Sequence, residues 1–542
     1  MDQLFIWLIT FIIQLYFQIL GFIFKTAFQA CLWVAQIIMK VMGACFLGLG
    51  WSFHQSFKSI GAAANSKDLL ILGPGESLKP GVRYREFFDY SQTADSKQVR
   101  NLAHGDSKNG DFWLGNYVTF RGSKPRLTTG VWIPSDFLHQ HVLIVGATGS
   151  GKTELLLKSA QNLMQKGNLV CVDAAGFLGD RLSSLARSAG SKLVCWDLSA
   201  TRNQVVWNFL EELGKSGSEK EIRAIAEALY GNFNDTDNNA AFWKRDIMWL
   251  TAILGIVVEA RRQNLIKLNP SDLPALVMDR DAVRALLSNL PQANAQWGSD
   301  LYSYLSLPDD RFGLDISFLQ NKLSPFKDPG VRKICDGASG IFLLQALNGT
   351  SRHALVVGQS LADGNFGSSL AAVMISYVMN VMYRRMRNPS HNWTPTYIVC
   401  DEAPRLKNIN YEELTAIGRN AKAGVFLMCQ SIDQFPEKTL PALNNCRTQI
   451  FLQGVSHKTA DWLSKQLGEY QRQVMTMTVN QGTFGPSPFN QKNVSYERVP
   501  VLGIWEISNR PLAALPSKLS AIVRMNASQS PTTKPFLTDY SA

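Results

Sequence analysis

A phosphate-binding loop near residue 150 constrains the fold of this 542-residue chain more than any other feature. An apolar strand pattern over 142–145 leads into GATGSGKT, and a helical pattern over 154–164 follows. A complete Walker A motif in this context is typical of a nucleotide-phosphate site between a strand and a helix. We predict that ATP is bound by the eight residues Gly146, Ala147, Thr148, Gly149, Ser150, Gly151, Lys152 and Thr153.

The residue types in this loop match the chemistry of a triphosphate. Glycines let the backbone curl so that its N–H groups point at phosphate oxygens, and the start of the helix adds a positive dipole end. We expect Lys152 to act in catalysis at the β- and γ-phosphates, and the Thr153 hydroxyl to bind Mg²⁺.

Carboxylates for this site are predicted at the end of a second apolar strand, 397–400. Asp401 and Glu402 follow it directly, where open α/β sheets bind their ligands. We expect Asp401 to hold Mg²⁺ and Glu402 to polarise the attacking water. A third strand, 425–429, ends in Gln430, for which we predict a catalytic role in sensing the γ-phosphate or positioning water. The alternative is that its amide binds only nearby backbone.

The wider pattern predicts an α/β fold with a mostly parallel sheet and helices on both of its faces. Further strand runs cover 169–172, 193–196, 354–357 and 449–452, and they alternate with helical patterns. Residues 212–338 lie between the two nucleotide motifs and show apolar spacing near 3.6 residues, which indicates an inserted all-helical domain.

The first 54 residues are predicted to anchor the chain in a membrane. Residues 4–24 carry no charge and exceed the roughly 20 residues that a spanning helix needs. A second apolar stretch, 27–53, contains Lys40, which is costly at the bilayer centre. It either completes a two-helix hairpin or lies in the interface, and Lys25 favours the second arrangement by the positive-inside rule.

Net charge and cysteine spacing indicate which partners and metals this chain would bind. The formal net charge of +11 favours anionic partners, either nucleic acid or an anionic membrane surface. The eight cysteines show no CxxC spacing, so we expect reduced thiols and no cysteine-bound metal.

Beyond Walker A, several segments together resemble the coupling proteins of type IV secretion and conjugation, which belong to the FtsK/HerA group of P-loop motors. The resemblance covers about residues 110–525. It is carried by CVDAAG after the second strand, VVWNFLEEL around Asn208, FWKRDIMWL at Phe242 and Trp243, CDEAPRL with the following AIGRNAKAGVFLMCQSIDQF, and ERVPVLGIWEISNRPLAALP.

This resemblance implies a RecA-like P-loop motor with N-terminal transmembrane helices, an inserted all-helical domain and a homohexameric ring. It favours the two-span hairpin at the N-terminus. It also places an arginine finger at Arg419, which would reach a neighbouring subunit's γ-phosphate across a ring-closing interface, with Arg447 as a competing candidate. The sequence departs from the family in its very short connection between the apolar stretches and in the turn 174–176, which lacks the usual lysine.

We therefore expect six segments along the chain. These are a membrane anchor (1–54), a connector (55–110), the first part of the nucleotide-binding domain (111–211), the helical domain (212–338), the second part of the nucleotide-binding domain (339–526) and a C-terminal tail (527–542).

The function implied is that of a coupling ATPase at the bacterial inner membrane, with its ATPase portion in the cytoplasm. It would recruit single- or double-stranded DNA with a relaxase and use ATP and Mg²⁺ to drive it into the type IV secretion channel. Contacts with the phosphate backbone would bind DNA without reading its sequence. The alternatives are an effector-protein secretion motor of the same fold, a docking receptor switched by ATP without pumping, and a septal chromosome motor.

Overall fold

The computed structural model describes a large sheet, a helical region and a separate strand pair. The described residues are 94, 97–99, 112–121, 124–174, 176, 178–196, 205–231, 240–358, 366–406, 409–478, 481–482, 485–486, 491–508, 520–525 and 534–540. The predicted anchor, 1–54, and nearly all of the connector, 55–110, lie outside them. Within the described ranges, no helix combines the length and apolarity needed to cross a bilayer.

Seven parallel strands form the centre of an eleven-stranded sheet. All seven strand patterns predicted from the sequence occur there. In spatial order the strands are β5 (Lys192–Trp196), β6 (His353–Gly358), β4 (Asn168–Asp173), β7 (Thr396–Cys400), β8 (Ala423–Cys429), β3 (Val142–Val145) and β9 (Thr448–Phe451).

Both faces of the parallel sheet are covered, which explains why its strands read as continuous apolar runs. Alternate side chains of β3 enter two different cores, Val142 and Ile144 on one face and Leu143 and Val145 on the other. The first core is shared with α4 (Lys152–Lys166) and α5 (Leu178–Ala189). The second is shared with α15 (Phe366–Met386), α16 (Tyr411–Ile417), α17 (Leu440–Asn445) and α18 (His457–Leu467).

Four antiparallel strands extend this sheet beyond β9, and they correct the predicted C-terminal boundary. Their order outward is β14 (Ser520–Met525), β15 (Phe536–Asp539), β1 (Phe112–Arg121) and β2 (Lys124–Ile133). Residues 527–542 are therefore not simply a tail, because β15 lies inside the sheet. Its pairing with β1, from the other end of the motor sequence, provides a stabilisation that no local pattern reveals.

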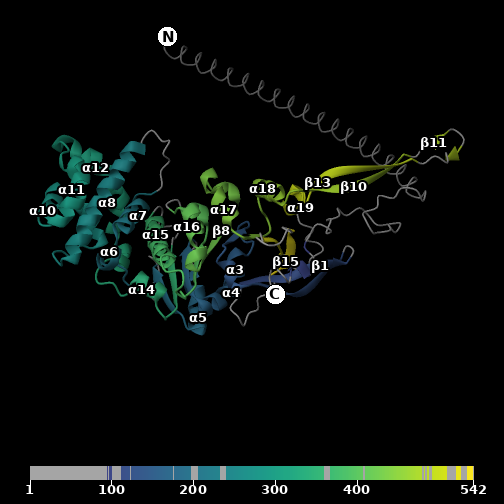
Figure 1. Ribbon diagram of the computed structural model, residues 1–542, viewed down its shortest axis with the longest axis horizontal. Coiled ribbons are helices and arrows are strands. Elements are labelled where there is room, and N and C mark those ends of the chain that lie inside the picture. Colours follow the sequence, from purple (N-terminus) through teal and green to yellow (C-terminus); the bar gives the residue numbers. More distant parts are fainter. Residues whose placement is uncertain are drawn as a thin grey trace, which may run out of the picture. The chain divides into compact units, whose positions relative to one another are not determined.

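The described part of the predicted helical insert contains only helices, which gather in one group (Figure 1). They include α6 (Phe209–Ser216), α7 (Glu219–Tyr230), α8 (Ala240–Arg262), α9 (Leu273–Leu276), α10 (Arg280–Ser288), α11 (Pro291–Leu305), α12 (Asp309–Leu323) and α13 (Pro329–Cys335). Residues 249–258 of α8 are buried on all sides and form the centre of this group, whereas the first turns of the helix leave Phe242 and Met248 exposed.

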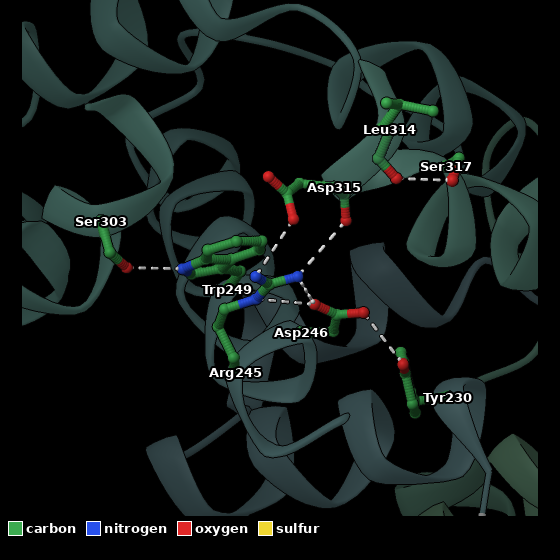
Figure 2. A network of polar contacts seen from close by, with 8 residues as sticks. All are labelled: Tyr230, Arg245, Asp246, Trp249, Ser303, Leu314, Asp315 and Ser317. Carbon is green, nitrogen blue, oxygen red and sulfur yellow. Dashed lines mark hydrogen bonds and ion pairs between the residues drawn. The ribbon is translucent and has the colours of Figure 1, made fainter. Parts of the chain in front are cut away.

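A polar network ties three of these helices together (Figure 2). Arg245 of α8 forms ion pairs with Asp246 at 3.2 Å and with Asp315 of α12 at 3.3 Å. Its guanidinium lies 4.3 Å from the ring centroid of Trp249. The hydroxyl of Tyr230, at the end of α7, donates to Asp246 Oδ2 at 3.0 Å. The buried carboxylate of Asp246 is thereby paired on both sides, which offsets the cost of its burial.

Residues 471–497 belong to a different compact unit from the motor sheet, so the predicted domain segment 339–526 is not continuous. Strand β10 (Glu469–Thr478) pairs with β13 (Gln491–Pro500). Between them, β11 (Gln481–Gly482) pairs antiparallel with β12 (Gly485–Pro486). The chain rejoins the motor unit at Arg498, near the end of β13, and continues into the short helix α19 (Ile504–Ser508).

Candidate nucleotide site

The Walker A loop connects the carboxyl end of β3 to the first turn of α4. Gly149 and Gly151 have φ angles of +77° and +90°, which residues with a β-carbon rarely adopt. A β-carbon on Gly146 would lie 2.4 Å from Ser150 Oγ and 2.7 Å from Leu452 Cβ. These three glycines therefore permit the tight curl that turns backbone N–H groups toward a phosphate.

Lys152 begins α4 and points back across the loop. Its Nζ donates to the carbonyl oxygens of Gly146 at 2.7 Å and Ala147 at 3.3 Å. The same nitrogen lies 3.8 Å from Glu402 Oε1. Its side chain is only 8% exposed, so bulk water screens this cation little and its attraction to an anion is strong.

Strand order brings the other predicted residues to the same edge. Strand β8 lies between β3 and β7, so Gln430 after β8 stands between the Walker A loop and the Asp401-Glu402 pair. Gln430 Nε2 donates to Glu402 Oε1 at 3.0 Å. Glu402 adopts a φ of +48°, uncommon for a residue with a side chain and typical of functional positions. The side chains of Lys152 and Gln430 thus both contact the same carboxylate oxygen of Glu402.

Asp401 is buried beside a second carboxylate that the sequence interpretation did not include, Asp173 at the end of β4. Burial, together with the negative charges of Asp173 and Glu402, raises the pKa of Asp401 to about 6. Asp173 accepts the backbone N–H groups of Gly176 at 2.9 Å and Leu178 at 2.6 Å, which caps α5. Asp173 could have been predicted as a site residue, because it ends a strand that lies next to β7.

The residues at this edge fit a nucleotide with Mg²⁺. Thr148 and Gly149 are exposed at the crest of the loop, and a β-carbon on Gly149 would meet no atom within 4 Å. The loop therefore keeps open space beside its N–H groups. Thr153 and Asp401 supply the hydroxyl and carboxylate oxygens that Mg²⁺ prefers. Lys152 would hold the terminal phosphates.

The two arginine candidates lie at the opposite edge of the sheet from this site. Arg419 opens the short helix η7 (Arg419–Ala421), just before β8 begins, and it is exposed. Arg447 precedes β9, contacts Gln140 Oε1 at 2.5 Å, and lies 4.3 Å from the ring centroid of Phe137. Neither is brought together with Lys152 of its own chain, and Arg447 is the more firmly held of the two.

A buried histidine organises the edge that carries Arg419. His141 has a φ of +65° and precedes β3. Its Nδ1 accepts the backbone N–H of Val425 at 3.1 Å, so its Nε2 donates to the carbonyl of Thr415 at 2.7 Å. It therefore links β3, which leads to the Walker A loop, with the helix that leads to Arg419. Burial lowers the pKa of His141 to about 4.

Acidification is expected to destabilise the fold through His141. Between its ordinary pKa of 6.5 and its folded value of about 4, the unfolded chain binds a proton that the folded chain excludes. Stability is therefore lost as pH falls through this window, by up to about 3 kcal/mol. Thermal unfolding between pH 7 and 4.5 measures this loss. The variant His141→Gln has no titrating group there and should show a shallower decline; an unchanged decline would contradict this role.

Fold and site together define a P-loop protein of the RecA-like class, with a mostly parallel α/β sheet. A family model described as type IV secretory system conjugative DNA transfer matches residues 91–508. The chain belongs to this family, the type IV coupling proteins.

Among curated proteins, the chain is 25% identical over 217 residues to the type 4 coupling protein DotL of Legionella pneumophila. That match covers 38% of this chain and 27% of DotL, so the chain aligns with about a quarter of that relative.

Among solved structures, the bacterial conjugative coupling protein TrwBdeltaN70 in its unbound form has a TM-score of 0.57 at 19% identity, over 79% of this chain and 93% of that one. The plasmid coupling protein TrwB in complex with ADP and Mg²⁺ has a TM-score of 0.54 at 18% identity, over 80% and 94%. At such identities the likeness shows the fold alone.

Proposed function

We propose that this chain is a Mg²⁺-dependent ATPase that drives DNA, delivered with a relaxase, into a type IV secretion channel. One observation carries the enzymatic part of this proposal. The side chains of Lys152 and Gln430 both contact the carboxylate of Glu402 beside the Walker A loop. The three residues come from three separate segments of the sequence. Membership of the conjugative DNA transfer family supports DNA as the substrate that is moved.

Each residue at the site has a defined task in this proposal. Lys152 holds the terminal phosphates. Its hydrogen bonds to the loop carbonyls are replaced by hydrogen bonds to the phosphate oxygens when ATP binds. Thr153 and Asp401 hold Mg²⁺, which neutralises charge on the phosphates when bound. Glu402 orients the attacking water, and its carboxylate is itself oriented by the Gln430 amide. Gln430 therefore couples the presence of the γ-phosphate to the position of Glu402.

A ring of identical subunits, which we propose to be a hexamer, gives Arg419 its task. The residue is exposed at the edge of the sheet opposite its own nucleotide site. Only a head-to-tail contact between subunits presents that edge to a neighbour's nucleotide, and such contacts form a ring when the rotation between subunits closes. Arg419 would there stabilise charge in the transition state.

The charge-free segment 4–24 and the apolar segment 27–53 lead us to place the chain in the bacterial inner membrane. The ATPase portion then lies in the cytoplasm, where ATP is available. In this arrangement the motor stands next to the channel components with which it would cooperate.

ATP hydrolysis by the detergent-solubilised full chain, with and without single- or double-stranded DNA, tests the proposal. We expect DNA to raise the rate several-fold at low salt, and the stimulation to decline steeply as salt rises, because phosphate contacts release counterions. A rate that depends on Lys152 but ignores DNA at every salt concentration would contradict DNA transport. It would favour a polypeptide cargo, to be tested by adding a secreted protein.

A further inference from the structure

A tyrosine from the last described segment touches the Walker A loop. Tyr540 follows β15 directly and is 1% exposed. Its hydroxyl donates a hydrogen bond to the backbone carbonyl oxygen of Ser150. Ser150 is the residue before Gly151, at which the loop passes into α4. A segment almost 400 positions away in the sequence thus contacts the loop backbone itself.

The backbone around Tyr540 is fixed on two sides. Lys158 of α4 donates from Nζ to the carbonyl oxygen of Tyr540 at 2.8 Å, and the same Nζ lies 4.5 Å from the ring centroid of Trp113. Strand β1 approaches closely at Gly115, where a β-carbon would lie 2.4 Å from the carbonyl oxygen of Asp539. Tyr540 is therefore held by α4 and by the sheet, and its hydroxyl has a defined position.

Peptide geometry connects this contact to phosphate binding. The carbonyl of Ser150 and the N–H of Gly151 belong to one planar trans peptide, so they point in opposite directions. Binding the carbonyl to Tyr540 turns the Gly151 N–H away from Tyr540. Gly151 has a φ of +90° and lacks a β-carbon, so the backbone beside this peptide offers little resistance to rotation. The Tyr540 hydroxyl restricts that rotation.

We propose that Tyr540 is a positioning residue for nucleotide binding, which holds the Ser150–Gly151 peptide with its N–H available to a phosphate oxygen. This inference rests on the proposed nucleotide site. The contact orients the loop equally before and during hydrolysis. Its loss should therefore weaken binding and raise KM without a comparable change in kcat.

The variant Tyr540→Phe of the full chain removes only the hydroxyl. We expect the dissociation constants for a fluorescent ATP analogue and for ADP, and the KM for ATP, to rise roughly three- to tenfold, as for the loss of one neutral hydrogen bond. A matched control is Tyr304→Phe, because the buried Tyr304 hydroxyl likewise donates to a backbone carbonyl, that of Val277, at 2.9 Å within the helical region.

Tyr304→Phe should bind nucleotide as the unmodified chain does, although both variants lose a buried hydrogen bond. Equal affinities for Tyr540→Phe and the unmodified chain would overturn this inference alone. Equal weakening in both variants would also overturn it, since a general loss of stability would then account for the effect. An unmodified chain that binds no nucleotide would overturn the proposed function and this inference with it.

Discussion

Replacement of Glu402 by glutamine is expected to lower the rate of ATP hydrolysis by roughly 10²- to 10⁴-fold while ATP binding is retained, since that is the range for loss of a general base. Glutamine has nearly the same shape, and its side-chain oxygen can still accept the Gln430 amide that now lies 3.0 Å from Glu402 Oε1. The variant loses the negative charge that, in the function we propose, draws a proton from the attacking water. Steady-state hydrolysis and equilibrium binding of ATP measure the two effects separately.

Glu412→Gln is the matched control, because Glu412 is an exposed glutamate on α16 outside the site. It should hydrolyse ATP at the unmodified rate. Retained hydrolysis in Glu402→Gln would show that another group activates the water. DNA transfer that survives Glu402→Gln but not Lys152→Ala would favour a docking receptor in which ATP binding alone suffices.

Replacement of Lys152 by alanine is expected to abolish detectable hydrolysis and to weaken ATP binding on the order of 100-fold. Each hydrogen bond from a charged group contributes about 1.5–3 kcal/mol, and Lys152 supplies the only cation within 4 Å of Glu402 among the described residues. Alanine also leaves the partly buried carboxylate of Glu402 without its nearby positive charge. The dissociation constant for ATP and the rate of ATP hydrolysis, both measured on the same preparation, test these two expectations.

The control for this variant is Lys166→Ala, which removes an exposed lysine from the last turn of the same helix, α4. Lys166→Ala should match the unmodified chain in both measurements. Near-normal ATP affinity in Lys152→Ala would contradict the assignment of the terminal phosphates to this side chain.

The centre of the sheet and the nucleotide motifs were predictable because their signals are local. A strand covered on both faces must be apolar along its whole length, so 169–172 and 354–357 could be identified without knowing their neighbours. The Walker A glycines and the Asp401-Glu402 pair lie directly at strand ends. Asp173 carried the same signal, since a carboxylate at the end of β4 must lie beside the end of β7 once the strand order is known.

The contributions of β15, Tyr540 and His141 could not be predicted, since they depend on pairing between distant segments. Four residues of β15 carry no periodic pattern long enough to identify a strand, and β1, with which they pair, lies more than 400 positions earlier. His141 precedes a strand in sequence, and only the folded chain brings the Val425 N–H and the Thr415 carbonyl to its ring.

The sheet topology also decides which nucleotide the arginine candidates could contact. The family resemblance placed an arginine finger at Arg419, but a position in the sequence does not tell which edge of the sheet a residue occupies. Because β8 runs parallel to β3, a residue before β8 lies at the edge opposite the Walker A loop. In the ring that we propose, Arg419 would therefore reach a neighbouring subunit's nucleotide and not its own. The firmer contacts of Arg447 suit a role in supporting that edge.

Movement along DNA driven by ATP can be observed as displacement of a third strand from a triplex placed at the end of a DNA duplex. With ATP and Mg²⁺, the unmodified chain is predicted to displace the third strand, whereas Glu402→Gln, with unchanged DNA binding, leaves it in place. An unmodified chain that hydrolyses ATP on this DNA without displacing the strand would contradict a DNA-transporting motor. Displacement by Glu402→Gln would contradict the role of hydrolysis at this site.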